Sequence, residues 1–349
     1  MKAGILTFHR AHSYGAVLQC YALMKVLEKK GHDVEIIDYR QPYIERRYSL
    51  RQVSLLTRVW NYNFFVNVLR IVKRTLTGGY IFRKFRHRYL KTGQSFKGNN
   101  IPDYDMYVIG SDQVWSSECT QGFDLTYFGE FARPKKSVLI GYSVSTTVKS
   151  LSEMDGKEIN RYLMAFDRIS FREKSIAGIA SQVSGKDFPV TLDPTLLLDA
   201  DEWREMSGGS YGGDVVVYTM YRPSCPYLWD AMRKRGRELA DRLGCQLIEI
   251  KQYNMGVENF VRTIASAKAV VTNSFHGVAF SVIFRRPLYA VSLGDSLDDR
   301  YVSLLKRIGA DSHIVSPDFD TKVIKDRFIL NEQQLESLRE ESFKFIPEA

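Results

Sequence analysis

Apolar and polar positions alternate along the opening of the chain in the way that a strand–helix–strand unit requires. Ala3–Phe8 is an apolar run of strand length, and Val34–Asp38 is a second one. Between them, Ala16–Lys30 spaces its apolar residues at helical intervals and ends in a charged tail, and Gly31 follows where the helix would stop. This order predicts the start of a parallel, doubly wound sheet.

The same pattern predicts further elements in the first half of the chain. They are strands at Tyr104–Ile109, Ser137–Ser145 and Ile169–Phe171 and a helix at Glu153–Phe166. Val190–Leu198 is expected to be an edge strand, because Pro194 lies in its middle and proline cannot donate a ladder hydrogen bond.

A turn-rich stretch, Ser207–Gly213, contains four glycines and precedes a second series of elements. These are strands at Asp214–Met220, Gln246–Ile250, Ala269–Thr272 and Leu288–Val291 and helices at Tyr227–Leu243, Val257–Ala267, Arg300–Ile308 and Glu332–Phe345. At 349 residues the chain is long enough for two domains. We therefore predict an α/β fold of two Rossmann-like domains facing a cleft, residues 1–206 and residues 207–349.

The formal charge of +9 is concentrated in one segment. Between Arg40 and Lys97 there are 14 Lys or Arg residues and one acid, Glu45, interleaved with aromatic residues. We expect a basic, aromatic helical insertion at about residues 41–98. Such a mixture suits an anionic membrane surface. It equally suits a helical hairpin whose aromatic residues pack on the domain while the cations stay in water. We expect no nucleic-acid partner, because no binding module accompanies the charge.

The expected cellular location of the protein follows from sequence features that the chain lacks. Its four cysteines form no C-x-x-C pair, the N-terminal apolar run is too short for a signal peptide, and no stretch reaches the length of a membrane span. We expect a soluble, cytoplasmic protein, with peripheral contact at the inner face of the plasma membrane as a further possibility through the basic segment.

In open parallel sheets, ligands bind where strands end and helices begin. The first such loop runs from His9 to Gly15 and is polar and aromatic, with Tyr14 beside the glycine. It lacks G-x-G-x-x-G, so it does not indicate a dinucleotide site. Surface histidines in an ordinary loop remain the alternative.

The second loop, Gly110–Trp115, follows the predicted strand Tyr104–Ile109. Ser111 or Asp112 is a candidate for chemistry or for capping the next turn. Trp115 is a candidate sugar-stacking residue or a core residue. Position alone does not separate these alternatives.

The third loop, Thr272–Gly277, carries the strongest signal. Asn273, Ser274 and His276 lie between a strand and a helix expected to begin at Val278, where an imidazole can contact a phosphate or exchange a proton. Arg300 and Arg172 add guanidinium groups suited to a carboxylate or phosphate, although each alone could be a surface ion-pair residue. No metal-ligand set stands out, and we expect neither a metal nor a cofactor.

Together these motifs resemble the polysaccharide pyruvyl transferase family over most of the chain. Their order and spacing carry the resemblance more than any one of them does. The matching segments are T-F-H at Thr7–His9 with S-Y-G-A-V-L-Q at Ser13–Gln19, V-I-G-S-D-Q-V-W at Val108–Trp115, S-F-R-E at Ser170–Glu173, L-D-P-T-L-L at Leu192–Leu197, T-N-S-F-H-G at Thr272–Gly277 and D-R-Y-V-S-L-L at Asp299–Leu305.

The resemblance implies a fold similar to the type B glycosyltransferases and a role in cell-surface polysaccharide (exopolysaccharide) biosynthesis. It also implies the reaction of the family, in which phosphoenolpyruvate gives a pyruvyl group to two sugar hydroxyls, forming a ketal and releasing phosphate. Several members act on sugars carried by a polyprenyl lipid. The best-known members have arginine two residues before the histidine, where this chain has Ser274. The donor-binding arginine must then come from elsewhere, or the donor differs.

On this reading His276 is the acid/base or phosphate contact and Asp112 orients or deprotonates the sugar. Arg300 and Arg172 hold the donor, and the other expected substrate-binding residues are Ser274, Gly277, Asn273, Ser111, Tyr14, Gly15, Gln19, His9 and Trp115. Two other functions stay open. One is a nucleotide-sugar-dependent glycosyltransferase, because fold does not fix function. The other is a non-catalytic protein that binds a lipid-linked glycan.

Overall fold

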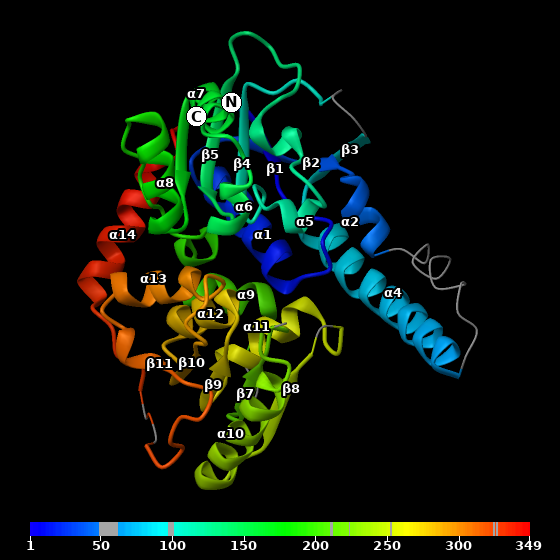
Figure 1. The fold of residues 1–349 in the computed structure, drawn as a ribbon, viewed down its shortest axis with the longest axis vertical. Helices are drawn as coiled ribbons and strands as arrows, with labels where there is room; N and C mark the ends of the chain where they lie inside the picture. Colours follow the sequence, from blue (N-terminus) through cyan, green and yellow to red (C-terminus); the bar gives the residue numbers. More distant parts are fainter. Residues whose placement is uncertain are drawn as a thin grey trace. The chain divides into compact units, whose positions relative to one another are not determined.

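The structure is a computed structural model that describes residues 1–48, 62–96, 101–209, 212–222, 224–251, 253–323, 325 and 327–349. Its contacts divide the chain into two units (Figure 1). Unit 1 comprises Met1–Pro194 and Lys344–Ala349, and unit 2 comprises Thr195–Phe343.

Unit 1 is built on a six-stranded sheet in the order β3-β2-β1-β4-β5-β6. Its strands are β1 (Lys2–Leu6), β2 (Asp33–Tyr39), β3 (Thr92–Phe96), β4 (Met106–Asp112), β5 (Val138–Val144) and β6 (Arg168–Phe171). All neighbouring strands pair in parallel. Helices connect them, so the central strands are buried on both faces and their sequences read as continuous apolar runs. The helices are α1 (Tyr14–Lys29), α2 (Pro42–Arg47), α4 (Tyr62–Tyr89), α5 (Ser117–Thr120), α6 (Val148–Ser152), α7 (Gly156–Ala165) and α8 (Lys174–Ser184), with a 3₁₀ turn η1 (Leu125–Phe128).

Unit 2 has a five-stranded parallel sheet in the order β11-β10-β9-β7-β8. The strands are β7 (Val215–Tyr218), β8 (Leu247–Ile250), β9 (Ala269–Thr272), β10 (Leu288–Val291) and β11 (Ile314–Val315). The helices are α9 (Ala200–Ser207), α10 (Leu228–Leu243), α11 (Val257–Ala265), α12 (Phe275–Phe284), α13 (Asp299–Arg307) and α14 (Glu332–Phe345), with the 3₁₀ turn η3 (Asp311–His313). Two parallel sheets connected by helices confirm the predicted α/β class.

The nine predicted strands other than the Val190–Leu198 edge are confirmed, with small shifts at their ends. The prediction for Val190–Leu198 is wrong. Val190 makes only an isolated bridge to Phe171, and Pro194–Leu197 forms a 3₁₀ turn, η2. Proline fixes φ and removes a backbone donor, so this segment cannot extend the ladder. The helix expected at Glu153–Phe166 begins three residues later, at Gly156, where Asp155 caps it.

The units meet in the sequence at Pro194, earlier than the glycine-rich stretch suggests. The reason is that α9 packs within unit 2. The Trp203 ring lies edge-on to Phe280 at 4.9 Å between centroids, and Arg262 donates to the Ser207 carbonyl. The last residues return to unit 1, where the Ala349 amide donates to the Lys30 carbonyl at 3.1 Å. The glycine-rich stretch is therefore a connection inside unit 2.

The expected insertion at 41–98 is described in part, because residues 49–61 and 97–100 lie outside the described residues. Its described parts are α2, α4 and the edge strand β3, which the helical expectation missed. Phe82 and Phe85 are buried, Phe82 against Tyr14, and His12 stacks on Tyr48. The aromatic-packing alternative thus holds for this end of α4. Within the described ranges, we find no helix with the length and apolarity to cross a bilayer.

The assignment of α9 gives a stability test. Trp203 is fully buried and donates from its indole nitrogen to the Thr195 carbonyl at 3.1 Å. We expect Trp203→Ala to lower the free energy of unfolding by about 3–5 kcal/mol, because it leaves a large cavity. Chemical denaturation followed by hydrogen exchange should show the loss in unit 2.

The matched control is Glu205→Ala, on the exposed side of the same helix, which we expect to change stability by less than about 0.5 kcal/mol. A loss of protection confined to unit 1 would contradict the position of α9.

His313 adds a pH-dependent contribution to unit 2. Its Nδ1 donates to the Leu288 carbonyl at 3.1 Å, and its Nε2 accepts from the Ile329 amide at 2.9 Å, which fits a neutral ring. Burial lowers the pKa of His313 below its usual value. Protonation would remove the acceptor that Ile329 uses.

We therefore expect the free energy of unfolding to fall as the pH drops below about 6.5, the unfolded pKa of histidine. The unfolded chain takes up a proton there that the folded chain resists. His313→Gln should flatten this slope, because it removes the ring whose pKa burial lowers. Equal slopes for the wild type and His313→Gln in urea titrations would contradict the assignment.

Candidate functional site

Strand order places one ligand-binding edge in each unit. In unit 1 the order reverses between β1 and β4, and in unit 2 between β7 and β9. The crevice for a ligand in such sheets lies at the carboxyl ends of the strands on either side of this reversal. The three candidate loops lie at the ends of these strands. His9–Gly15 follows β1, Gly110–Trp115 lies at the end of β4, and Thr272–Gly277 lies at the end of β9. The cleft expected between the domains stays a prediction.

At the edge of unit 1, the loop after β1 is tied to the end of β4. The Thr7 hydroxyl donates to the Ser111 carbonyl at 2.9 Å, and the Gln19 amide of α1 donates to the Thr7 hydroxyl at 2.8 Å. Gln19 is fully buried, and its Oε1 accepts no hydrogen bond among the described residues. These contacts join the loop after β1 to α1 and to the end of β4.

Asp112 ends β4 in an unusual backbone conformation. Its φ is +83°, and Ser143 at the end of β5 has φ +48°. Left-handed conformations of non-glycine residues cost on the order of 1–3 kcal/mol and cluster at functional sites. The side chain of Asp112 is partly exposed and lies 3.9 Å from a terminal nitrogen of Arg172. The Asp112 carboxylate is thus held at the carboxyl end of β4, beside the buried guanidinium of Arg172.

Arg172, which follows β6, is the centre of a buried ion-pair network. Its guanidinium donates to Asp193 at 3.0 Å, to Glu173 at 3.1 Å and to the Ser145 hydroxyl at 2.8 Å. Ser111 also donates to Asp193, at 3.1 Å. Although burial opposes it, the charges of Glu173 and then Asp193 raise the pKa of Arg172 above its usual value. These contacts hold the strand ends in place.

This network explains the S-F-R-E and L-D-P segments in physical terms. Removing one member of a buried ion pair leaves an uncompensated charge, which costs about 3–5 kcal/mol. Asp193 and Ser145 were not among the expected site residues. Ser145 directly follows β5, which is a signal in the sequence, whereas Asp193 lies three residues after the isolated bridge of Val190 to Phe171.

His9 lies beside this edge in a buried cluster of charges. Its Nε2 lies 2.9 Å from Asp38, which also accepts from Arg10 at 2.8 Å. Although burial alone would raise it, the hydrogen bond from His9 and the charge of Arg10 hold the pKa of Asp38 well below its usual value. His9 is 1% exposed, so the cluster anchors the loop after β1 to the end of β2.

Three residues of unit 1 that were expected to contact substrate are buried. The Trp115 indole donates to the Tyr127 carbonyl at 2.8 Å and stacks on Phe128, so it is a core residue and offers no face to a sugar. Tyr14 is 1% exposed, and Gly15 is buried in the first turn of α1. Tyr14 and Gly15 are buried by the packing of α1, and Trp115 by its contacts with Tyr127 and Phe128, which a sequence window cannot separate from an exposed loop.

At the edge of unit 2, Asn273 ties the loop after β9 to the loop after β7. Its side chain accepts from the Met220 amide at 2.6 Å and donates to the Met220 carbonyl at 2.9 Å. The Thr272 hydroxyl donates to the Tyr218 carbonyl at 2.6 Å and accepts from the Ser274 amide at 3.0 Å. Both sides of the strand reversal are therefore held by side chains of the T-N-S segment.

The helix after this segment, α12, begins at Phe275, three residues earlier than expected. Ser274 is its N-cap and accepts from the Gly277 amide at 3.4 Å. His276 therefore lies in the first helical turn and is partly exposed, next to the Phe275 ring. The first turn of a helix has free amides and a positive dipole end, which favour an anion.

Arg222 is a residue of this edge that sequence reasoning missed. It is 3% exposed and donates to Asp298 at 2.6 Å, with Asp295 at 3.7 Å. Asp298 also accepts from the Ser292 hydroxyl at 2.9 Å and the Leu293 amide at 2.6 Å. The loops after β7 and β10 are thus joined through one ion pair, and no local motif marks Arg222 as a partner of a residue so far along the chain.

Arg300 lies in the first turn of α13, two residues after Asp298, and donates to the Leu297 carbonyl at 3.4 Å. The helices α12 and α13 contact each other and follow adjacent strands, β9 and β10. His276 and Arg300 are therefore carried by neighbouring helix N-termini at one edge of the sheet. Within the described ranges, no group of three or more His, Cys, Asp or Glu side chains is arranged to hold a metal ion.

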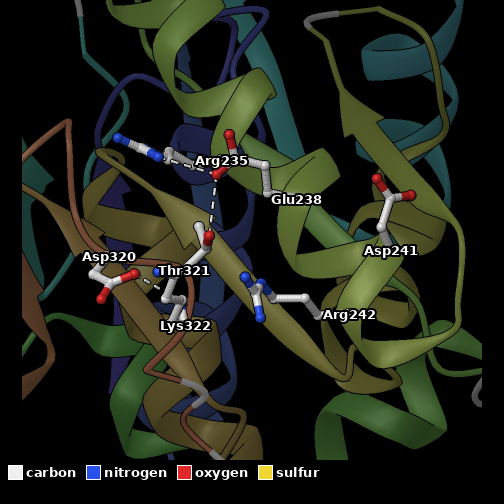
Figure 2. Close-up of a pocket in the computed structure, with 7 residues that line it drawn as sticks. All are labelled: Arg235, Glu238, Asp241, Arg242, Asp320, Thr321 and Lys322. Carbon is white, nitrogen blue, oxygen red and sulfur yellow. Dashed lines mark hydrogen bonds and ion pairs between the residues drawn. The ribbon is translucent and has the colours of Figure 1, made fainter.

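A pocket of about 520 Å³ lies elsewhere in unit 2 (Figure 2). Glu238 of α10 accepts there from Arg235 and from Thr321, each at 3.0 Å. Its lining comes from the second half of α10 and the loop after β11, and carries as many cations as carboxylates. Because the end of α10 lies near Lys268, just before β9, this pocket is toward the amino ends of the strands. It is not the candidate site.

The family model for polysaccharide pyruvyl transferase matches residues 14–296, about four fifths of the chain. The chain belongs to the polysaccharide pyruvyl transferase family. The matched range contains Asp112, Arg172 and the T-N-S-F-H-G segment, whereas Arg300 lies just beyond it. The protein is thus a transferase by family.

Solved structures of nucleotide-sugar enzymes are similar to this pyruvyl transferase family member at low identity. The UDP-GlcNAc 2-epimerase of Methanocaldococcus jannaschii, in complex with UDP-GlcNAc and UDP, is 12% identical at a TM-score of 0.43, covering 98% of this chain and 100% of its own. A putative UDP-N-acetylglucosamine 2-epimerase from Listeria monocytogenes is 14% identical at a TM-score of 0.44, covering 98% of this chain and 86% of its own. A spinosyn rhamnosyltransferase complexed with thymidine diphosphate is 12% identical at a TM-score of 0.39, covering 99% and 96%.

These structural similarities are too weak to assign a function to the protein. No curated protein matches its sequence.

Gly277 offers a test of the geometry at the α12 N-terminus. A Cβ at this position would lie 2.5 Å from the Thr272 hydroxyl and 2.9 Å from its methyl carbon. We expect Gly277→Ala to push α12 away from β9 and lower the free energy of unfolding by about 1–3 kcal/mol. Thermal and urea unfolding would measure it.

Gly178→Ala is the control, because this exposed helical glycine has no atom within 4 Å of the added carbon. We expect it to be neutral or stabilising by about 0.4–1 kcal/mol. A stable Gly277→Ala variant would mean that helix and strand do not approach as described.

Proposed function

We propose that this protein transfers the pyruvyl group of phosphoenolpyruvate to two hydroxyls of a saccharide in cell-surface polysaccharide synthesis. The family match over residues 14–296 carries the proposal. It is supported by an imidazole and a guanidinium at neighbouring helix N-termini of unit 2, where an anionic donor is favoured.

The reaction needs a proton donor, a proton acceptor and stabilisation of negative charge. The methylene carbon of phosphoenolpyruvate takes up one proton and becomes the ketal methyl group. Two sugar hydroxyls bond to the central carbon, and its bond to the phosphate oxygen breaks. Of the two hydroxyl protons, one balances the methyl group and the other leaves with phosphate. No oxidant, metal or cofactor enters this balance.

In this proposal His276 exchanges the proton or contacts the departing phosphate. It is partly exposed in the first turn of α12, where free amides add to the stabilisation of an anion. Arg300 faces the donor's carboxylate or phosphate, a role that guanidinium groups fill by paired hydrogen bonds. Ser274, Asn273 and Gly277 set the position of these groups.

Asp112 is the proposed group that orients or deprotonates the sugar hydroxyl. Its left-handed backbone and partial exposure support this assignment. Arg172 acts through Asp193, Glu173 and Ser145 and keeps a positive charge behind the Asp112 carboxylate. We therefore assign Arg172 a positioning role in place of direct donor binding. A free or polyprenyl-diphosphate-linked saccharide is the proposed acceptor, and the cytoplasm the proposed compartment.

The test is phosphate release from phosphoenolpyruvate in the presence of a panel of free and lipid-linked saccharides, with product mass as a second readout. We expect His276→Ala to reduce turnover by at least about 100-fold, the range of general acid–base catalysis. Arg300→Met should mainly raise the KM for phosphoenolpyruvate. Circular dichroism checks that both variants fold.

Lys306→Met is the matched control for Arg300→Met, because Lys306 is exposed near the other end of the same helix. Unchanged turnover in His276→Ala would remove His276 from the mechanism. Thermal stabilisation by uridine or guanosine diphosphate but not by phosphoenolpyruvate would replace the proposed donor with a nucleotide sugar. Saccharide binding without phosphate release from any donor would indicate a non-catalytic protein.

A further inference from the structure

Helix α4 carries a large positive charge without any acidic residue of its own. From Tyr62 to Tyr89 there are seven Lys or Arg residues and no Asp or Glu. A structural helix of this length usually mixes both signs, because i to i+4 pairs of opposite charge stabilise it. Arg86 is largely buried near Asp38 and Glu45 of the same unit, whereas Arg83 and Lys84 are exposed and point to a negatively charged surface outside the chain.

The two faces of its C-terminal half differ sharply. Phe82 and Phe85 are 0% and 1% exposed, and they meet Tyr14 and Tyr21 of α1. At 100° per residue these buried rings lie opposite another set of side chains. That outer set comprises Leu76, Tyr80, Arg83, Lys84 and His87, all of them exposed.

The outer set forms a single face, which we call the outer face of α4. At helical spacing its five residues fall within an arc of about 100°. Leu76 and Tyr80 are each 60% exposed, and they belong to the same face as the exposed cations. Figure 1 shows α4 reaching away from the sheet of unit 1.

We propose that the outer face of α4 docks on an anionic lipid bilayer surface. Leucine and tyrosine enter the interface between headgroups and acyl chains, while Arg83 and Lys84 contact the negative headgroups. An RNA or an acidic protein would use the cations but leave Leu76 without an apolar environment. Because α4 is too polar to cross a bilayer, it lies along the surface.

Docking is independent of pyruvyl transfer, so the two proposals can fail separately. The test is co-sedimentation of the full chain with vesicles of phosphatidylglycerol and phosphatidylcholine, without donor or acceptor. We expect binding to these vesicles, little binding to phosphatidylcholine alone, and weakening at high salt. Each cation near the surface contributes about fivefold to the partition coefficient, so Arg83→Glu with Lys84→Glu should reduce binding by more than about tenfold.

The matched control is Lys135→Glu with Lys136→Glu, an equal charge change at two exposed positions elsewhere in unit 1. It should retain most of the binding. Leu76→Ser with Tyr80→Ser should weaken the binding that persists at high salt.

Equal losses in the two charge-reversal variants would indicate attraction by net charge alone and overturn the proposal. Absence of binding to the anionic vesicles would overturn it as well. So would binding of the wild type to RNA in preference to the anionic vesicles.

Discussion

Parallel strand pairing is the constraint on which the candidate site depends. It brings the carboxyl ends of all strands of a sheet to one edge, and the order of the strands decides which loops become neighbours there. In unit 1 this joins the loops after β1 and β4, and in unit 2 those after β7 and β9. Residues a hundred positions apart, such as Thr7 and Ser111, meet for this reason alone.

Buried polar contacts then convert a set of strand ends into a rigid frame. Arg172 is surrounded by Asp193, Glu173 and Ser145, and Arg222 joins the loops after β7 and β10 through Asp298. A buried charge without its partner is costly, so each network admits few alternative arrangements. The partly exposed Asp112 and His276 side chains are therefore carried by strand and helix ends that are themselves held in place, which is what positioned chemistry requires.

The proposed catalytic groups and the proposed membrane-binding face lie on different parts of the chain. The proposed chemistry lies at the carboxyl edges of the sheets, where helix N-termini favour anions. The proposed membrane contact lies on the outer face of α4, whose opposite face packs on α1. Such separation allows the positive charge of the basic segment to serve attachment to a surface while the catalytic groups keep their own charge balance.

The sequence by itself determined most strands and helices, the α/β class and the segments that carry Asp112 and His276, because hydrophobic periodicity and strand-end motifs are local properties. Only the tertiary structure decided that Trp115 and Tyr14 are core residues and that Arg172 is enclosed by carboxylates. It alone showed that Arg222 pairs with Asp298 and that α9 belongs to unit 2. Burial and ion pairing depend on residues distant in the chain, and no window of sequence contains both partners.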